Sequence, residues 1–214
     1  MAEEETKNEE EFGVIGIFPC PVYVTKRNSN LDSTEEKEIE DIIEEGMGKS
    51  KYNLTSNNIY IFNTKLEKIR EFCEQHIKIY VETTINPKEE LDFYITQSWL
   101  NVTKQGKDNP QHRHPNSIIS GVFYVSTIEY DRILFYNPLE RQEILQFDNS
   151  SAYALEVEDC QLILFPSWLQ HSVKPNEKAT KDRLSISFNV FAKGVFGQKE
   201  EGTELILEGT ELIL

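Results

Sequence analysis

The sequence predicts an α+β protein, mainly β, in which two N-terminal helices pack on a β barrel or sandwich. Over residues 33–45 and 63–81, apolar side chains recur at steps of three and four, as in helices with one buried face. From residue 92 onwards the pattern changes to short runs rich in β-branched and aromatic residues, separated by turn-forming segments. Helices followed by seven or more short strands indicate this architecture.

The first helix is expected over about residues 33–45, because Ser33 followed three positions later by Glu36 is a capping-box pattern. Isoleucines supply its apolar stripe, and nearby glycines end it. The second helix is expected over about residues 63–81, with His76 close to its buried face as a structural histidine. Extended segments are expected over residues 12–25 and 58–62.

The β region contains seven expected strands. They cover residues 92–103, 117–126, 133–136, 143–147, 152–157, 160–165 and 183–191. Gly121, inside the second of them, is expected to mark a bulge or a close approach of the backbone.

Length and charge limit the class of protein. The 214 residues fit one domain, and no apolar run is long enough to cross a membrane. The net charge of −15 is concentrated at the ends, with −5 in residues 1–11 and −5 in residues 200–214. An acidic chain without a basic stripe argues against binding to nucleic acid. The acidic N-terminus has no apolar signal-peptide core, so the expected compartment is the cytoplasm, where the three cysteines stay reduced.

The expected organisation is one domain over residues 12–198, with a helical part at about 33–84 and a barrel at about 92–192. Acidic tails flank it at residues 1–11 and 199–214. The second tail contains the heptapeptide EGTELIL twice in tandem, and two copies are too few for a repeat fold.

Three of the four histidines are candidates for one metal site. His112 and His114 stand two residues apart, and side chains at that spacing on a strand point to the same face. His171 ends another strand-like run and can add a third ligand, which leaves open positions for water and substrate. The spacing alone fits ordinary loop histidines at least as well, so the hypothesis depends on residues further along the chain.

Arg183 and Ser185 provide that support. They open the last apolar strand and share one of its faces. A fixed guanidinium beside a hydroxyl is a receptor for a carboxylate, although a surface ion pair is the common fate of such an arginine. A metal with a carboxylate receptor nearby implies that a chelating organic acid binds between them.

The order H-x-H, then H-x-V-x-P from His171, then R-x-S from Arg183 resembles the iron(II)- and 2-oxoglutarate-dependent oxygenases. It is most similar to a bacterial and phage branch related to the prolyl 4-hydroxylases. The similarity covers about residues 93–191 and includes the stretches WLN, SGVFYV, FPSW and SISFN.

The resemblance implies a double-stranded β-helix, a jelly-roll (cupin-like) barrel with the metal inside one mouth. It implies that His112 and His171 bind Fe(II), and that Arg183, Ser185 and Tyr124 bind the cosubstrate 2-oxoglutarate. For Tyr124, an ordinary core position is an equally good interpretation. The implied reaction hydroxylates a peptidyl proline or a small metabolite and releases succinate and CO2. Ascorbate as an accessory reductant and a homodimer are further expectations.

One position departs from the family pattern. His114 stands where the family has an aspartate or glutamate ligand. Either His114 is the third ligand, or it turns away and a water or another carboxylate completes the shell. Asn101, Trp168 and Asn189 are further candidates for the pocket, and Trp99 is expected to pack in the core.

Two alternatives stay open. A zinc site with three histidines would activate water for a hydrolase or lyase reaction, but such an enzyme does not require the Arg-x-Ser receptor. A barrel that has lost activity and serves in binding or assembly is the other, and the histidine in place of an acid favours it.

Overall fold

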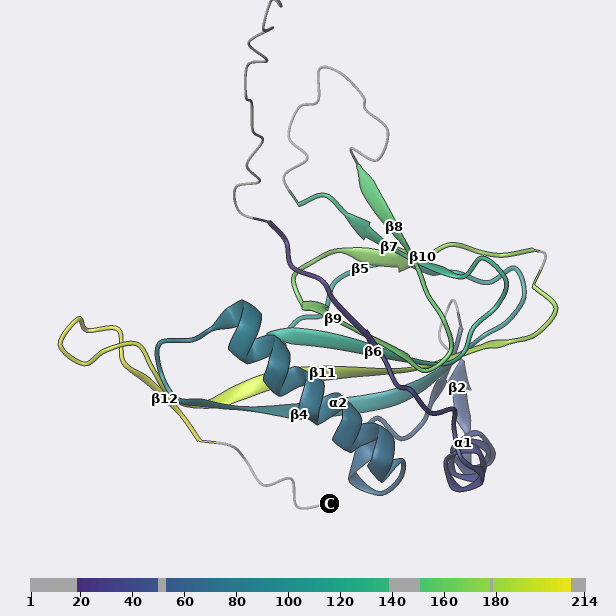
Figure 1. Cartoon of the computed structure of the whole chain (residues 1–214), viewed down its shortest axis with the longest axis horizontal. Coiled ribbons are helices and arrows are strands. Elements are labelled where there is room, and N and C mark those ends of the chain that lie inside the picture. The colour runs from purple at the N-terminus through teal and green to yellow at the C-terminus, as the bar shows by residue number, and fades with distance from the viewer. Residues whose placement is uncertain (1–18, 50–52, 139–150, 178, 209–214) are drawn as a thin grey trace, which may run out of the picture.

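The structure is a computed structural model that describes residues 19–49, 53–138, 151–177 and 179–208. Two antiparallel sheets face each other, and helix α2 lies across the outer face of the larger one (Figure 1). The larger sheet has eight strands, in the order β1 (Tyr23–Lys26), β9 (Gln161–Pro166), β6 (Ile119–Ser126), β11 (Arg183–Phe196), β4 (Leu91–Thr103), β3 (Leu54–Ser56) and β2 (Met47–Lys49), with β12 (Leu205–Leu207) on the end of β11. The smaller sheet has the order β5 (Asn109–His112), β10 (His171–Val173), β7 (Arg132–Tyr136) and β8 (Ala152–Glu156).

The larger sheet separates an apolar layer from a partly polar one. On β6, Ile119, Phe123 and Val125 join the core beneath the helices, whereas Val122 and Tyr124 face the smaller sheet. Strand β11 alternates more sharply, with apolar side chains toward the helices and Arg, Ser and Asn toward the other sheet. Because side chains alternate between the faces of a strand, β11 brings a row of polar groups between the sheets.

The mainly β fold with packed helices is confirmed, and it is the double-stranded β-helix arrangement. No strand pairing joins the two sheets in the described ranges, so they are not a closed barrel. Strands 92–103, 117–126, 133–136, 152–157, 160–165 and 183–191 correspond to β4, β6, β7, β8, β9 and β11. The expected strand at 143–147, the N-terminal tail and residues 209–214 of the second heptapeptide lie outside the described residues, whereas Leu205–Leu207 of the first copy form β12.

Helix α1 (Ser33–Glu45) has the expected bounds, but the predicted cap is wrong. Asp32 accepts hydrogen bonds from the backbone of the first turn, and the Glu35 side chain accepts one from the Asp32 backbone. Glu35 can do so because it is buried and ion-paired to Arg27, with 2.6 Å between Oε1 and Nη1. A contact with a residue outside the helix therefore decides which acid caps it.

Other local predictions also fail at their boundaries. Helix α2 (Glu67–Tyr80) begins later than expected and continues into a π-helical turn, η2 (Val81–Ile85). The strand expected at 58–62 is wrong: η1 (Ile61–Asn63), a 3-10 turn, occupies its end. Strands β2, β3, β5 and β10 were not predicted, because three or four residues are too few to carry a period. None of the helices in the described ranges is long and apolar enough to cross a membrane.

Gly121 is a close approach of the kind predicted. A Cβ atom built there would lie 2.1 Å from the Phe188 ring of the neighbouring strand. We expect Gly121→Ala to lower the free energy of unfolding by about 1–3 kcal/mol, because the packed ring has to move. Urea denaturation measures this, and an unchanged midpoint would contradict it.

Candidate metal centre and carboxylate pocket

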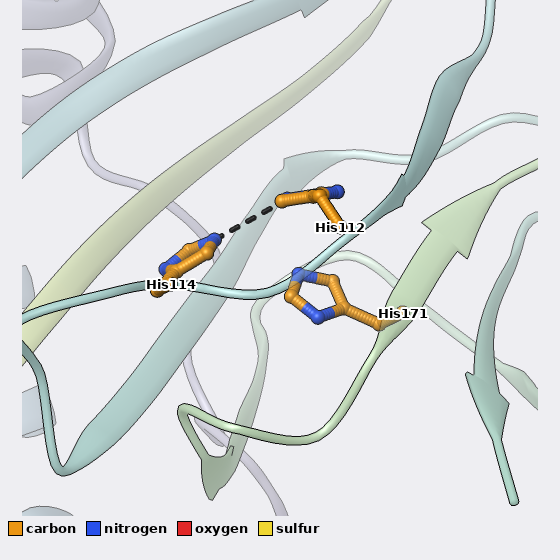
Figure 2. Close-up of side chains that lie close together, drawn as sticks. All are labelled: His112, His114 and His171. Atoms are coloured by element: carbon orange, nitrogen blue, oxygen red, sulfur yellow. Dashed lines mark hydrogen bonds between the residues drawn. The ribbon is translucent and has the colours of Figure 1, made fainter.

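Three histidines converge between the sheets (Figure 2). His112 is the last residue of β5 and His171 the first of β10, and the two are direct partners in the strand pairing. His114 lies beyond the end of β5, not on the strand, and its backbone N–H donates to Ser167 O at 3.0 Å. One ring nitrogen from each histidine lies within 4.8 Å of the other two. Among the described residues, no carboxylate belongs to this group. Asp108, the nearest acid upstream of His112 in the sequence, also lies outside it.

The hydrogen bonds of His112 and His171 fix which ring nitrogen is free. Nδ1 of His112 lies 2.8 Å from Pro110 O, and Nδ1 of His171 lies 3.0 Å from Leu169 O. A carbonyl oxygen only accepts, so both Nδ1 atoms carry the proton. Each Nε2 therefore presents a lone pair, as in histidines that bind metal ions.

His114 is held by side chains of other strands. Its Nδ1 lies 2.7 Å from Asn189 Oδ1, and the Asn189 amide donates to Gln97 Oε1 at 3.2 Å. Ser120 Oγ lies 3.0 Å from the same Nδ1 and 2.9 Å from Ser167 Oγ. With the Asn189 oxygen as acceptor, His114 also carries its proton on Nδ1 and leaves Nε2 free.

The Nε2 atoms of His112 and His114 lie 3.3 Å apart, the contact drawn in Figure 2. With both protons on Nδ1, no hydrogen remains to bridge them, so two lone pairs face each other. A cation between the rings turns this repulsion into coordination. Three imidazoles suit zinc, copper, nickel or iron, so the residues present fit a divalent transition metal.

Burial keeps the imidazoles of His171 and His114 neutral. It lowers the pKa of His171 to about 3, with a further contribution from His112, and it also lowers the pKa of His114. A histidine must be neutral to bind a metal, so His171 and His114 need lose no proton at physiological pH.

Arg183, Ser185 and Tyr124 line the same cavity of about 1350 Å³. Ser185 on β11 pairs with Tyr124 on β6, and the Arg183 guanidinium carbon lies 5.1 Å from the centre of the Tyr124 ring. The Tyr124 hydroxyl is buried without a hydrogen-bond partner among the described residues. Burial raises its pKa to about 12, against the positive charge of Arg183, so it stays a donor at neutral pH. A guanidinium and two hydroxyls in one cavity are groups that can bind a carboxylate.

Asp131 is the residue of this region that the sequence did not reveal. It lies just before β7, and its Oδ2 atom is 3.1 Å from Arg183 Nε, with both side chains buried. The angle is not that of a hydrogen bond, so both atoms keep unused hydrogen-bonding capacity. Nothing in the stretch Tyr130-Asp131-Arg132 resembles a motif, and no local signal could have connected it to Arg183.

Only some of the further residues predicted to line the pocket do so. Asn101 and Asn189 line the cavity. Trp168 does not: it lies in the turn between β9 and β10 with 53% of its surface exposed. Trp99, expected in the core, lines the cavity instead, and its ring centre is 5.9 Å from that of His114. The alternation of β4 and β11 puts the Asn and Trp99 side chains on the face toward the histidines.

If Asn189 sets the tautomer of His114, Asn189→Ala should lower the affinity for a divalent metal by about 10–100-fold. Competition titration with Mn²⁺ or Zn²⁺ measures this. Asn101→Ala is the matched control, because Asn101 is bonded to Ser187 and Thr55 and to no histidine. Equal losses in both variants would contradict the role of Asn189.

Residues 97–189 match a family model described as "Putative 2OG-Fe(II) oxygenase". Over these residues the chain is similar to the 2-oxoglutarate- and iron(II)-dependent oxygenases. The match runs from β4 to β11 and contains the three histidines together with Arg183 and Ser185 of β11. No curated protein matches the chain.

Several solved structures share the fold. The carbocyclase SnoK from nogalamycin biosynthesis, titled as α-ketoglutarate-dependent, has a TM-score of 0.58 at 13% identity, covering 81% of this chain and 81% of its own. A prolyl hydroxylase from Trichoplax adhaerens, in complex with a peptide fragment, has 0.57 at 13%, covering 79% and 83%. HygX from Streptomyces hygroscopicus, with nickel and 2-oxoglutarate bound, has 0.56 at 9%, covering 80% and 82%. These likenesses establish the architecture.

Proposed function

We propose that the protein is an Fe(II)- and 2-oxoglutarate-dependent dioxygenase that hydroxylates an uncharged, polar part of its substrate. The observation that carries the proposal is the convergence of three free Nε2 atoms in a cavity that also holds Arg183, Tyr124 and Ser185. One end of the cavity suits a metal and the other suits a carboxylate. A molecule that chelates with one end and carries a carboxylate at the other fits this division.

In this proposal His112, His114 and His171 hold the metal through Nε2. Arg183 binds the distal carboxylate of 2-oxoglutarate, and the hydroxyls of Tyr124 and Ser185 donate hydrogen bonds to it. The bound iron and cosubstrate supply the oxidation, in which 2-oxoglutarate, O2 and a C–H bond give succinate, CO2 and an alcohol. The buried strands β6 and β9 keep bulk water from the end of the cavity that contains Tyr124 and Arg183.

The third ligand is the main difference from the family pattern. His114 is neutral, so a divalent metal keeps its full charge of +2 until a dianionic cosubstrate binds. The fixed tautomer of His114 and its bond to Asn189 support ligation by this residue rather than a water or a distant acid.

The lining of the outer cavity suggests the class of substrate. Among the described residues that line it, the side chains beyond the histidines and Arg183 carry no charge, and they include Tyr60, Asn63, Tyr94, Gln97, Trp99 and Asn116. A charged group in such a site would lose hydration without gaining a partner. Carboxamides and aromatic rings instead suit an uncharged segment of a peptide or of a small polar metabolite.

The test is the release of succinate from 2-oxoglutarate in the presence of O2 and Fe(II), measured by NMR. We expect metal-dependent succinate formation, with CO2 released in equal amount. Tight zinc binding without turnover of 2-oxoglutarate would favour the three-histidine zinc enzyme. Failure to bind either metal or 2-oxoglutarate would leave a binding or assembly barrel.

A further inference from the structure

The buried ion pair of Asp131 and Arg183 marks a spot with unused polar capacity. In the described part of the chain, four buried side-chain polar atoms have no hydrogen-bond partner. Three of them lie together here: Arg183 Nε, Asp131 Oδ2 and the Tyr124 hydroxyl. Native proteins satisfy nearly all such groups. Arg183 Nε and Asp131 Oδ2 lie against each other at 3.1 Å, so the Tyr124 hydroxyl, on a residue that lines the cavity, is the atom left for a bound polar ligand.

Asp131 and Arg183 are placed differently with respect to the cavity. Arg183 lines it, whereas Asp131 does not and contacts the guanidinium at Nε. Because Asp131 contacts the guanidinium at Nε, the terminal amino groups of Arg183 are the ones assigned to a ligand carboxylate. Asp131 therefore contacts the guanidinium on the side away from the cavity and fixes its orientation.

The charges in this part of the protein balance. Arg183 is charged at all physiological pH values, and its side chain is only 4% exposed. Burial raises the pKa of Asp131, and Arg183 opposes that rise. When Asp131 is ionised, the buried guanidinium has a charged partner. Without that partner, the buried guanidinium would strongly destabilise the fold.

We propose that Asp131 is a positioning and specificity-determining residue, which orients Arg183 and cancels its charge. The inference rests on the proposed function. With neutral histidines, a divalent metal, dianionic 2-oxoglutarate and the Arg183–Asp131 pair, the loaded cavity has no net charge. The distal carboxylate is then selected by pairing with a preset guanidinium rather than by an excess of positive charge.

The test is a double-variant cycle of Asp131→Asn and Arg183→Gln in the full-length protein. Calorimetry under argon gives the affinity of the Mn²⁺-loaded protein for 2-oxoglutarate and for 2-oxovalerate, which has a methyl group in place of the distal carboxylate. In Arg183→Gln, the buried Asp131 carboxylate repels the distal carboxylate. Adding Asp131→Asn should recover about tenfold of the lost 2-oxoglutarate affinity. Affinity for 2-oxovalerate should change by less than about twofold in either variant, since it brings no second charge.

Asp182→Asn is the matched control, because Asp182 precedes Arg183 in the chain but pairs with Lys104 at the surface. It should leave both affinities unchanged. The proposal is overturned if the double variant binds 2-oxoglutarate as weakly as Arg183→Gln does. It is also overturned if the affinities for 2-oxoglutarate and 2-oxovalerate change in parallel. If Asp131→Asn alone does not fold, the comparison of Arg183→Gln with the double variant still decides. Wild-type protein that binds neither acid would instead contradict the proposed function.

Discussion

Replacing His171 by alanine should abolish stable metal binding while leaving the protein folded. The ring is almost fully buried, directly beside His112, and its Nδ1 is already used by Leu169. Alanine removes one of three converging Nε2 atoms, and the remaining two cannot enclose a metal ion. We expect a loss of more than about 100-fold in affinity for Fe(II) or Mn²⁺, because even the groups that only orient a ligand are worth 10–100-fold. Metal analysis after dialysis measures it, and succinate formation should fall to background.

The fourth histidine offers a matched control. His76 is bonded to the Tyr23 hydroxyl at 2.7 Å and lies on helix α2, outside the histidine cluster. His76→Ala should keep the full metal content, even if the protein becomes less stable. Retention of metal by His171→Ala, or an equal loss in both variants, would show that the cluster is not the metal site.

Arg183→Ala should have the largest effect on the cosubstrate. Truncating one partner of a buried charge pair costs about 2–5 kcal/mol, so the affinity for 2-oxoglutarate should fall by about 30-fold to several thousandfold. Metal content should stay near that of the wild type, because Arg183 does not belong to the histidine cluster. Calorimetry with 2-oxoglutarate on metal-loaded protein, below the lowered unfolding temperature of the variant, separates the two effects.

Arg132→Ala controls for the loss of a positive charge. Arg132 follows Asp131, but its side chain is 46% exposed and pairs with Glu156 at the surface. Surface ion pairs contribute little, so this variant should bind 2-oxoglutarate normally. An unchanged affinity in Arg183→Ala would remove Arg183 from the receptor and leave the carboxylate end of the cavity without an assigned cation.

The fold was predictable where a pattern was long. Strands β4, β6 and β11 carry at least eight residues each, and their composition identified all three. Strands β5 and β10 carry four and three residues, too few for a period, although they bear His112 and His171. These short strands form only because the neighbouring chain offers hydrogen bonds. The N-cap of α1 failed for a similar reason, since the buried contact with Arg27 favours Glu35 over Glu36.

The candidate site was predictable in its parts and not in its connections. The order of the histidines and Arg183 along the chain indicated a metal and an acid, and the structure brings them to one cavity. The sequence did not predict that Trp99 lines the cavity, because this depends on which face of β4 meets the smaller sheet. It also did not predict that Trp168 is exposed, because this depends on the direction of the turn between β9 and β10.

The sequence by itself determined the residue types and the faces they occupy. Alternation along β11 puts Arg183, Ser185 and Asn189 on one face, because successive side chains of any strand point to opposite sides. Only the tertiary structure decided which distant groups meet these residues. It pairs His112 with His171, sets the proton of His114 through Asn189, and puts Asp131 behind Arg183. Such contacts depend on how the two sheets pack, and local sequence carries no record of that packing.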